Sequence, residues 1–71
     1  MNKYRVLYKI EFIDDCGRKG VTPDYAIYFN KVNPFEEPDW RLEFNAYASF
    51  ERMNPGWKAL SAKLVKRERL Y

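Results

Sequence analysis

Residues Tyr4 to Ile13 constrain the fold more than any other stretch of this chain. Every even position in this stretch is apolar or aromatic, whereas Arg5, Lys9 and Glu11 occupy odd positions. A period of two with β-branched and aromatic residues is typical of a strand with one buried face. The sequence therefore predicts a β-strand over residues 4–13, with its even side toward the core.

The following residues predict a second strand paired with the first. Two Asp and two Gly between Asp14 and Gly20 are typical of a turn. Residues 25–32 favour a strand, and Pro23 lies just before it, where a missing N–H costs no ladder hydrogen bond. We therefore expect an antiparallel hairpin with a long loop. Residues 33–40, with two prolines and several acids, predict an irregular connection.

Residues 41–51 return to the alternating pattern. Leu42, Phe44, Ala46, Ala48 and Phe50 share one side of the segment if it is extended. A helix would instead group Trp40, Phe44, Tyr47 and Glu51, which is a poorer apolar stripe. The pattern therefore favours a third strand.

The final segment favours a helix over residues 55–69. Asn54 is a suitable N-cap, and Pro55 suits the first helical position. Trp57, Leu60 and Leu64 recur at spacings of three and four, as on one face of a helix. The alternative is a type II turn at residues 54–57 followed by a fourth strand.

These elements predict a single small α+β domain over residues 1–71. We expect a three-stranded antiparallel β-meander with one C-terminal α-helix packed on one face, an order βββα. The predicted core contains mainly aliphatic and aromatic side chains. Its members are Val6, Ile10, Phe12, Ile27, Phe29, Leu42, Phe44, Phe50, Trp57, Leu60 and Leu64.

The residue inventory restricts both stabilisation and chemistry. A single cysteine, Cys16, excludes an intramolecular disulfide, and the absence of histidine excludes the usual zinc sites and histidine-dependent triads. The three glycines are too scattered for a phosphate-binding loop. Asp14 and Asp15 are interpreted as a solvated turn, and Cys16 as an uninvolved thiol. We therefore expect no enzymatic activity, no cofactor and no metal.

Charge is distributed unevenly along the chain. Residues 1–56 carry eight cations and nine acids, whereas residues 57–71 carry five cations and one acid. This basic tail, which includes Lys63, Lys66, Arg67 and Arg69, indicates an acidic partner. No apolar run approaches the ~18 residues of a membrane span, and the N-terminus lacks a signal-peptide pattern. We expect a cytoplasmic protein that does not bind membranes.

The second face of the predicted sheet is the candidate partner-binding surface. It would combine tyrosines and an aliphatic side chain with mixed charges, a composition that suits protein contacts. Its expected members are Arg5, Leu7, Lys9, Tyr28, Arg41 and Tyr47, with Leu7, Tyr28 and Tyr47 as anchors. The acidic loop of Glu36, Glu37 and Asp39 and the basic tail would orient the partner.

The sequence therefore favours a small non-catalytic binding module that occupies a macromolecular surface. A protein partner fits best, in the role of an inhibitor or adaptor such as small phage-encoded proteins directed at host enzymes or defences. Nucleic-acid binding through the tyrosine face and basic tail is the alternative. A second alternative is a structural subunit of a homo-oligomer. Without any partner, cross-strand tyrosines would stabilise the sheet, and the tail cations would favour solubility.

Overall fold

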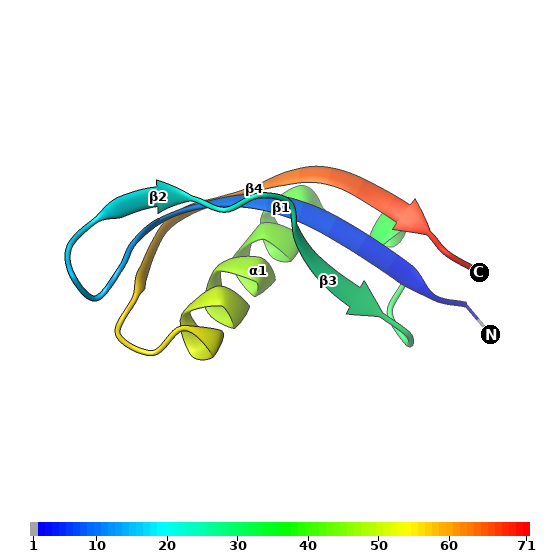
Figure 1. Ribbon diagram of the computed structural model, residues 1–71. Helices are drawn as coiled ribbons and strands as arrows, with labels where there is room; N and C mark the ends of the chain where they lie inside the picture. The colour runs from blue at the N-terminus through cyan, green and yellow to red at the C-terminus, as the bar shows by residue number, and fades with distance from the viewer. Residues whose placement is uncertain (1) are drawn as a thin grey trace.

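The strand β1 (Tyr4–Ile13) is the central strand of a four-stranded antiparallel sheet in the computed structural model, which describes residues 2–71. One 15-residue helix lies against this sheet (Figure 1). The remaining elements in chain order are β2 (Lys19–Val21), β3 (Tyr25–Phe29), the short 3-10 helix η1 (Pro34–Glu36), α1 (Asp39–Met53) and β4 (Lys58–Arg69).

The two edges of β1 are used differently. β4 pairs with β1 along its whole length, from Tyr4 opposite Arg69 to Ile13 opposite Lys58. β2 and β3 must therefore share the other edge, where β3 pairs with residues 4–8 and β2 with residues 11–13. Register shifts after Leu7 and after Glu11 each leave one extra residue in β4. Such β-bulges increase the twist and bend of a sheet.

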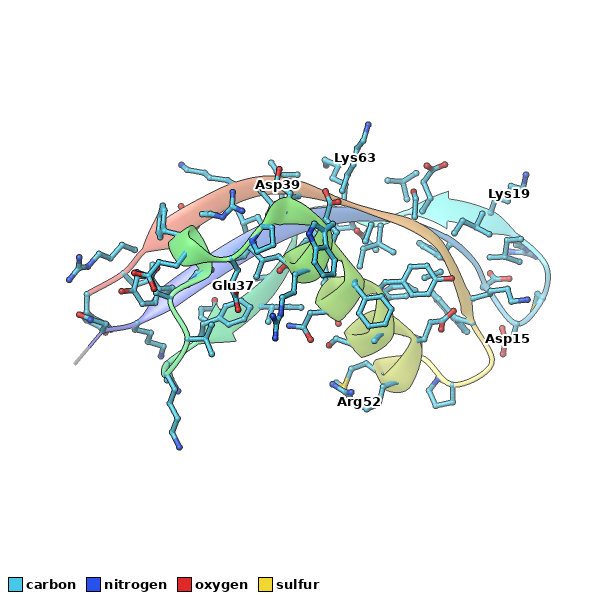
Figure 2. All side chains as sticks on the ribbon, turned by 180° about the vertical axis from the view of Figure 1, so that it is seen from behind. Asp15, Lys19, Glu37, Asp39, Arg52 and Lys63 are labelled. Atoms are coloured by element: carbon cyan, nitrogen blue, oxygen red, sulfur yellow. The ribbon has the colours of Figure 1, made fainter. Side chains whose placement is uncertain are left out.

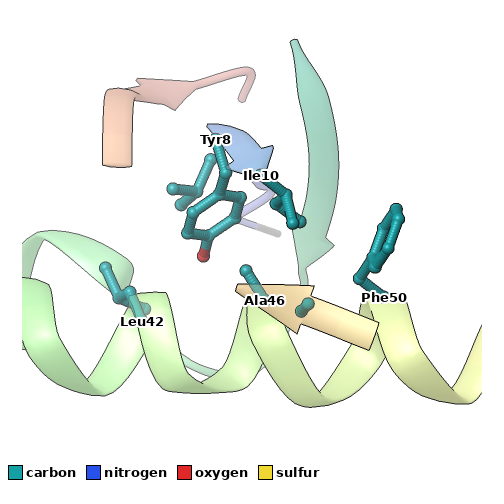
Figure 3. Packing of buried hydrophobic residues seen from close by; sticks show 7 residues of the cluster. Tyr8, Ile10, Leu42, Ala46 and Phe50 are labelled. Atoms are coloured by element: carbon teal, nitrogen blue, oxygen red, sulfur yellow. The ribbon is translucent and has the colours of Figure 1, made fainter. Parts of the chain in front are cut away.

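The core lies between β1 and α1 (Figure 3). The even side of β1 is buried, and α1 presents Leu42, Ala46 and Phe50 to it at spacings of four. These three helical residues are at most 3% exposed. Figure 1 shows α1 on the concave side of the arched sheet, so the convex side carries no helix. Within residues 2–71, no helix has both the length and the apolar character needed to cross a bilayer.

Several predictions from the sequence are confirmed. The strand over residues 4–13, its antiparallel pairing with the next long strand and Pro23 before that strand agree with the structure. The α+β class, with an antiparallel sheet and one helix on one face, is also confirmed. The second strand ends at Phe29, earlier than the predicted residue 32. The short strand β2 was not predicted.

The prediction of a third strand over residues 41–51 is wrong. These residues belong to α1, because Leu42, Ala46 and Phe50 form a buried stripe at helical spacing. The same three residues also lie at even positions, so the segment satisfies both periods. Asp39 in the first turn and Arg52 in the last turn complement the helix dipole.

The prediction of a C-terminal helix is also wrong, and the turn followed by a fourth strand is correct. Asn54 caps the end of α1, where its side-chain Nδ2 donates to the Phe50 carbonyl at 2.9 Å. The Trp57 N–H then donates to the Asn54 carbonyl at 3.0 Å, and Gly56 has φ of 86°. A positive φ at the third residue is the requirement of a type II turn. The order is therefore βββαβ.

Two members of the predicted core lie outside it. Phe44 is 69% exposed and Leu60 is 45% exposed, because the first faces away from the sheet on α1 and the second is the extra residue at a bulge of β4. Tyr4 and Tyr8 are buried instead, at 5% and 0% exposure. The even side of β1 is therefore aromatic as well as aliphatic.

Candidate functional site

The outer side of α1 carries an exposed row of aromatic side chains. Trp40 and Phe44 are one helical turn apart, and each is 69% exposed. Tyr47, three residues further on, is partly buried against the core and continues the row. We call Trp40, Phe44 and Tyr47 the aromatic ridge. Large apolar side chains exposed together, unlike those scattered singly, mark interaction sites.

Two shallow grooves adjoin the ridge. The first, of about 460 Å³, lies between the ridge and β4 and is lined by Trp40, Phe44, Tyr47, Glu43 and Ala62. The second, of about 530 Å³, shares Trp40 and Phe44 with the first. Its other lining residues are Phe29, Val32, Glu37, Arg41, Leu42, Asn45 and Ala48. Trp40 and Phe44 therefore project between two hollows, an arrangement suited to interlocking with another surface.

Two carboxylates of α1 cover the free edge of β4 beside this ridge. Glu43 Oε2 accepts from the Leu64 N–H at 2.8 Å, and Glu51 Oε2 accepts from the Ala59 N–H at 2.9 Å. Exposed edge strands pair readily with other chains unless their N–H groups are blocked. The glutamates therefore disfavour strand addition along this part of β4, which leaves side chains as the accessible contacts there.

The opposite face of the sheet has a different character. Residues paired across the strands share a face, so the register assigns its members. We call this surface the open sheet face. Its paired residues are Arg5, Leu7, Lys9, Glu11 and Ile13 of β1, Lys19 and Val21 of β2, Ala26 and Tyr28 of β3, and Lys58, Ser61, Lys63, Lys66 and Glu68 of β4.

One end of the open sheet face is an ion-pair network. Arg5 Nε donates to Glu68 Oε1 at 2.6 Å, and Lys66 Nζ lies 3.6 Å from the other oxygen of Glu68. The Arg5 guanidinium holds the pKa of the Glu68 carboxyl below its usual value. Lys3 Nζ lies 5.7 Å from the centre of the Tyr28 ring, within the range of a cation–π contact. Tyr28 is nevertheless 54% exposed.

The structure divides the predicted basic tail between two faces. Lys63 and Lys66 belong to the open sheet face. Arg67 lies opposite Val6 and turns to the helix side, where it donates to the Pro34 and Glu37 carbonyls, each at 2.9 Å. Arg69 donates to the Tyr71 carbonyl and to Asn2 Oδ1.

The predicted acidic loop is partly engaged within the chain. Arg67 Nη2 donates to Asp39 Oδ1 at 2.6 Å, and Glu37 lies 3.8 Å from Arg41. Arg67 therefore fixes the connection between β3 and α1, so neither it nor Asp39 is a free charge for a partner. Glu36 is exposed.

Two of the predicted site residues do not belong to the sheet. Arg41 and Tyr47 are both on α1, so their placement beside Tyr28 on one sheet face is wrong. Arg5, Leu7, Lys9 and Tyr28 do share a face, as the alternation predicts. The set predicted as one surface is therefore split across opposite sides of the molecule.

The turn after β1 agrees with its interpretation as a solvated turn. Asp14 Oδ1 accepts from the backbone N–H groups of Cys16 and Arg18, each at 2.9 Å. Ligand atoms of Asp14, Asp15 and Cys16 lie within 4.8 Å of one another. Because the Asp14 carboxylate already caps the turn, the cluster has a structural explanation.

The sequence interpretation missed the main feature of the helix side. Trp40 and Phe44 were not among the predicted site residues, although the alternative helical grouping of residues 40, 44 and 47 identifies the aromatic ridge. Aromatic residues at i, i+4 and i+7 were the available signal. No protein-family model, curated protein or solved structure matches this chain.

Proposed function

We propose that this protein is a non-catalytic binding module that engages another protein through the aromatic ridge. The single observation that carries this proposal is the exposure of Trp40 and Phe44, at 69% each, between two grooves. Exposing two adjacent large aromatic side chains has no benefit for folding, since each could bury on the order of 150–250 Å². A partner that covers them recovers this hydrophobic free energy.

The spacing of the ridge fits a known mode of recognition. Helices that dock into apolar grooves use anchors at i, i+3 or i+4, and i+7. Trp40, Phe44 and Tyr47 have the spacing i, i+4 and i+7 on a helix that the sheet already holds in place. A preorganised helix loses little conformational entropy on binding. The partner is therefore expected to present an apolar cleft about two helical turns long.

The proposed role is that of an inhibitor or adaptor, which acts by occupying the partner's cleft. Glu37, Arg41 and Asn45 border the second groove and provide polar groups at the rim. Interfaces commonly combine such a rim with an aromatic centre. Binding of a second copy through the same ridge is the competing arrangement, and it would make the mass dependent on concentration.

The test compares variants that remove exposed apolar side chains from the two ends of α1. Trp40→Ala with Phe44→Ala should weaken binding to a partner, first captured with the wild-type chain, by at least about 100-fold, since anchors contribute ~2 kcal/mol or more each. Met53→Ala is the control, because Met53 is 70% exposed at the other end of α1. Calorimetric titration with the purified partner measures both.

Circular dichroism must show that the double variant retains the fold. Equal affinity of the double variant and the wild-type chain would overturn the proposal. Sedimentation equilibrium decides between a different protein and a second copy as the occupant.

A further inference from the structure

The excess positive charge of the chain is concentrated on the open sheet face. This face holds six cations, which are Arg5, Lys9, Lys19, Lys58, Lys63 and Lys66. Its two acids are Glu11 and Glu68, so its net charge is +4. The other seven cations and eight acids of the chain give −1, and together these make the net charge of +3. The open sheet face is therefore basic, whereas the rest of the chain is slightly acidic.

The acids on this face leave several cations uncompensated. Glu68 is shared by Arg5 and Lys66, while Lys9 lies 3.5 Å from Asp24 at the sheet edge. Within residues 2–71, the exposed Lys19, Lys58 and Lys63 form no ion pair. Figure 2 shows Lys63 projecting from the side of the sheet opposite α1, whereas Arg52 lies on the α1 side.

The pairing of Lys9 with Lys63 places two cations side by side, and only Lys9 has an acid partner among residues 2–71, Asp24. The two residues lie directly opposite each other on neighbouring strands. Like charges in this position destabilise a sheet, whereas opposite charges stabilise it. An anion bound over the face would relieve this repulsion. Asp24 compensates Lys9 in part, and a polyanionic partner would compensate Lys63.

The shape of the face selects among polyanions. The sheet arches over α1, so the basic face is convex (Figure 1). β3 flanks β1 at residues 4–8 and β2 flanks it at residues 11–13, and Thr22 between them hydrogen-bonds to Ile10, so β1 has a neighbour on both edges along the face. Strands of ribbons and sheets can lie in the major groove of B-form DNA, which is about 12 Å wide. The major groove of A-form RNA is too narrow.

The length of the basic face also suits a duplex. From Arg5 to Ile13, β1 advances roughly 26 Å at about 3.3 Å per residue. This length corresponds to about eight phosphates along one strand of a duplex at 3.4 Å each. Lys58 and Lys19 flank Ile13 at one end, and Lys66 lies beside Leu7 toward the other. Cations are thus distributed along the whole face.

We propose that the open sheet face binds double-stranded DNA, with strands β1 and β4 in the major groove and their lysines on the phosphates. Tyr28, which is 54% exposed, adds uncharged surface on the same face. This site is separate from the aromatic ridge, so the protein would carry one partner on each side.

The experiment measures fluorescence anisotropy of a labelled DNA duplex with the full chain between about 50 mM and about 200 mM salt. We expect Lys63→Gln to weaken binding and to reduce the slope of log affinity against log salt by about 1. Arg52→Gln has the same change in charge on the helix side and should leave both quantities unchanged. Lys58→Gln is a second variant of the basic face, with the same expected loss.

Thermal unfolding separates a binding role from a structural one. Because Lys63→Gln removes the repulsion with Lys9, its melting temperature should equal or exceed that of the wild-type chain while its affinity for DNA falls. Lower stability of this variant, or equal losses for Lys63→Gln and Arg52→Gln, would overturn the proposal. The absence of duplex binding at low salt would overturn it too, as would equal or tighter binding of single-stranded DNA or double-stranded RNA.

The double variant Trp40→Ala with Phe44→Ala distinguishes this proposal from the proposed function. It should bind DNA as the wild-type chain does, whereas Lys63→Gln should still engage the protein partner. Loss of DNA binding in the double variant with its fold intact would contradict two separate sites.

Discussion

The helix α1 carries two apolar stripes, of which one is buried and the other is exposed. Leu42, Ala46 and Phe50 are at most 3% exposed, whereas Trp40 and Phe44 are each 69% exposed. Both stripes recur at helical spacing, and the exposed one holds the larger side chains. Hydrophobicity alone therefore does not decide which stripe becomes core. The difference indicates that the first stripe supports folding and the second is available for function.

The largest expected effect tests this division directly. Phe50 packs against Phe12, Tyr25 and Trp57, with ring centroids 5.4, 5.8 and 6.2 Å away. Phe50→Ala should lower the free energy of unfolding by about 3–5 kcal/mol, because it opens a cavity in the core. Phe44→Ala, the same change on the exposed stripe, should alter it by no more than about 0.5 kcal/mol. Urea unfolding measures the free energy of unfolding of both variants. Similar losses in the two would show that the exposed stripe supports folding as much as the buried one.

Tyr8 of β1 belongs to the same buried core as the first stripe and provides a second test of it. Its side chain is 0% exposed, and its hydroxyl has no hydrogen-bond partner within residues 2–71. Burial raises the pKa of Tyr8 from 10.0 to about 12. Between these two values the unfolded chain loses this proton while the folded chain keeps it. The contribution of the Tyr8 ionisation to stability is therefore complete below pH 10 and is lost as the pH rises to about 12.

At 1.36 kcal/mol for each pKa unit, this loss amounts to roughly 2–3 kcal/mol for a shift of this size. The Tyr8→Phe variant has no phenol to ionise, so it should not show this loss of stability between pH 10 and about 12. At neutral pH it should leave stability unchanged or raise it slightly, because a buried hydroxyl without a partner is itself costly. Unfolding curves of both proteins across this pH range measure the difference. A large loss of stability in Tyr8→Phe at neutral pH would show that the hydroxyl has a partner.

A smaller effect on the free energy of unfolding is expected at Glu43, which lies between the two stripes on α1. Glu43→Ala removes the acceptor of the Leu64 N–H and should cost about 1 kcal/mol. Glu43→Gln retains an oxygen acceptor and should lose less. Urea unfolding measures the cost, and sedimentation tests whether the uncovered β4 edge promotes association. Identical behaviour of the Ala and Gln variants would show that the carboxylate does not protect this edge.

The sequence by itself determined the parts of the fold that depend on local chemistry. The alternation of residues 4–13 predicted both β1 and the open position of Arg5, Leu7 and Lys9, because a period of two assigns each side chain to a face. The Asp and Gly residues after β1 predicted the turn for a similar reason. The charge imbalance of the last 15 residues also predicted a basic C-terminal segment, although not that it would be a strand.

Only the tertiary structure decided which later segment is the helix and which is the strand. Residues 42, 46 and 50 fit a strand or a helix equally, and Ala59, Leu60 and Lys63 are good helix formers that nonetheless lie in β4. β1 has a second edge whose N–H and C=O groups need partners along ten residues, and β4 provides them. That requirement outweighs helix propensity, because the ordinary residue types differ from one another in helix propensity by less than about 1 kcal/mol per residue.

The same choice placed the two proposed binding surfaces. With residues 39–53 helical, Tyr47 and Arg41 left the sheet, and Trp40 and Phe44 formed the aromatic ridge. With residues 58–69 extended, Lys63 and Arg67 came to opposite faces of β4. Alternation, bulges and pairing register set these positions, because a shift of one residue moves a side chain to the other face. No local pattern in residues 58–69 specifies that register without β1 beside it.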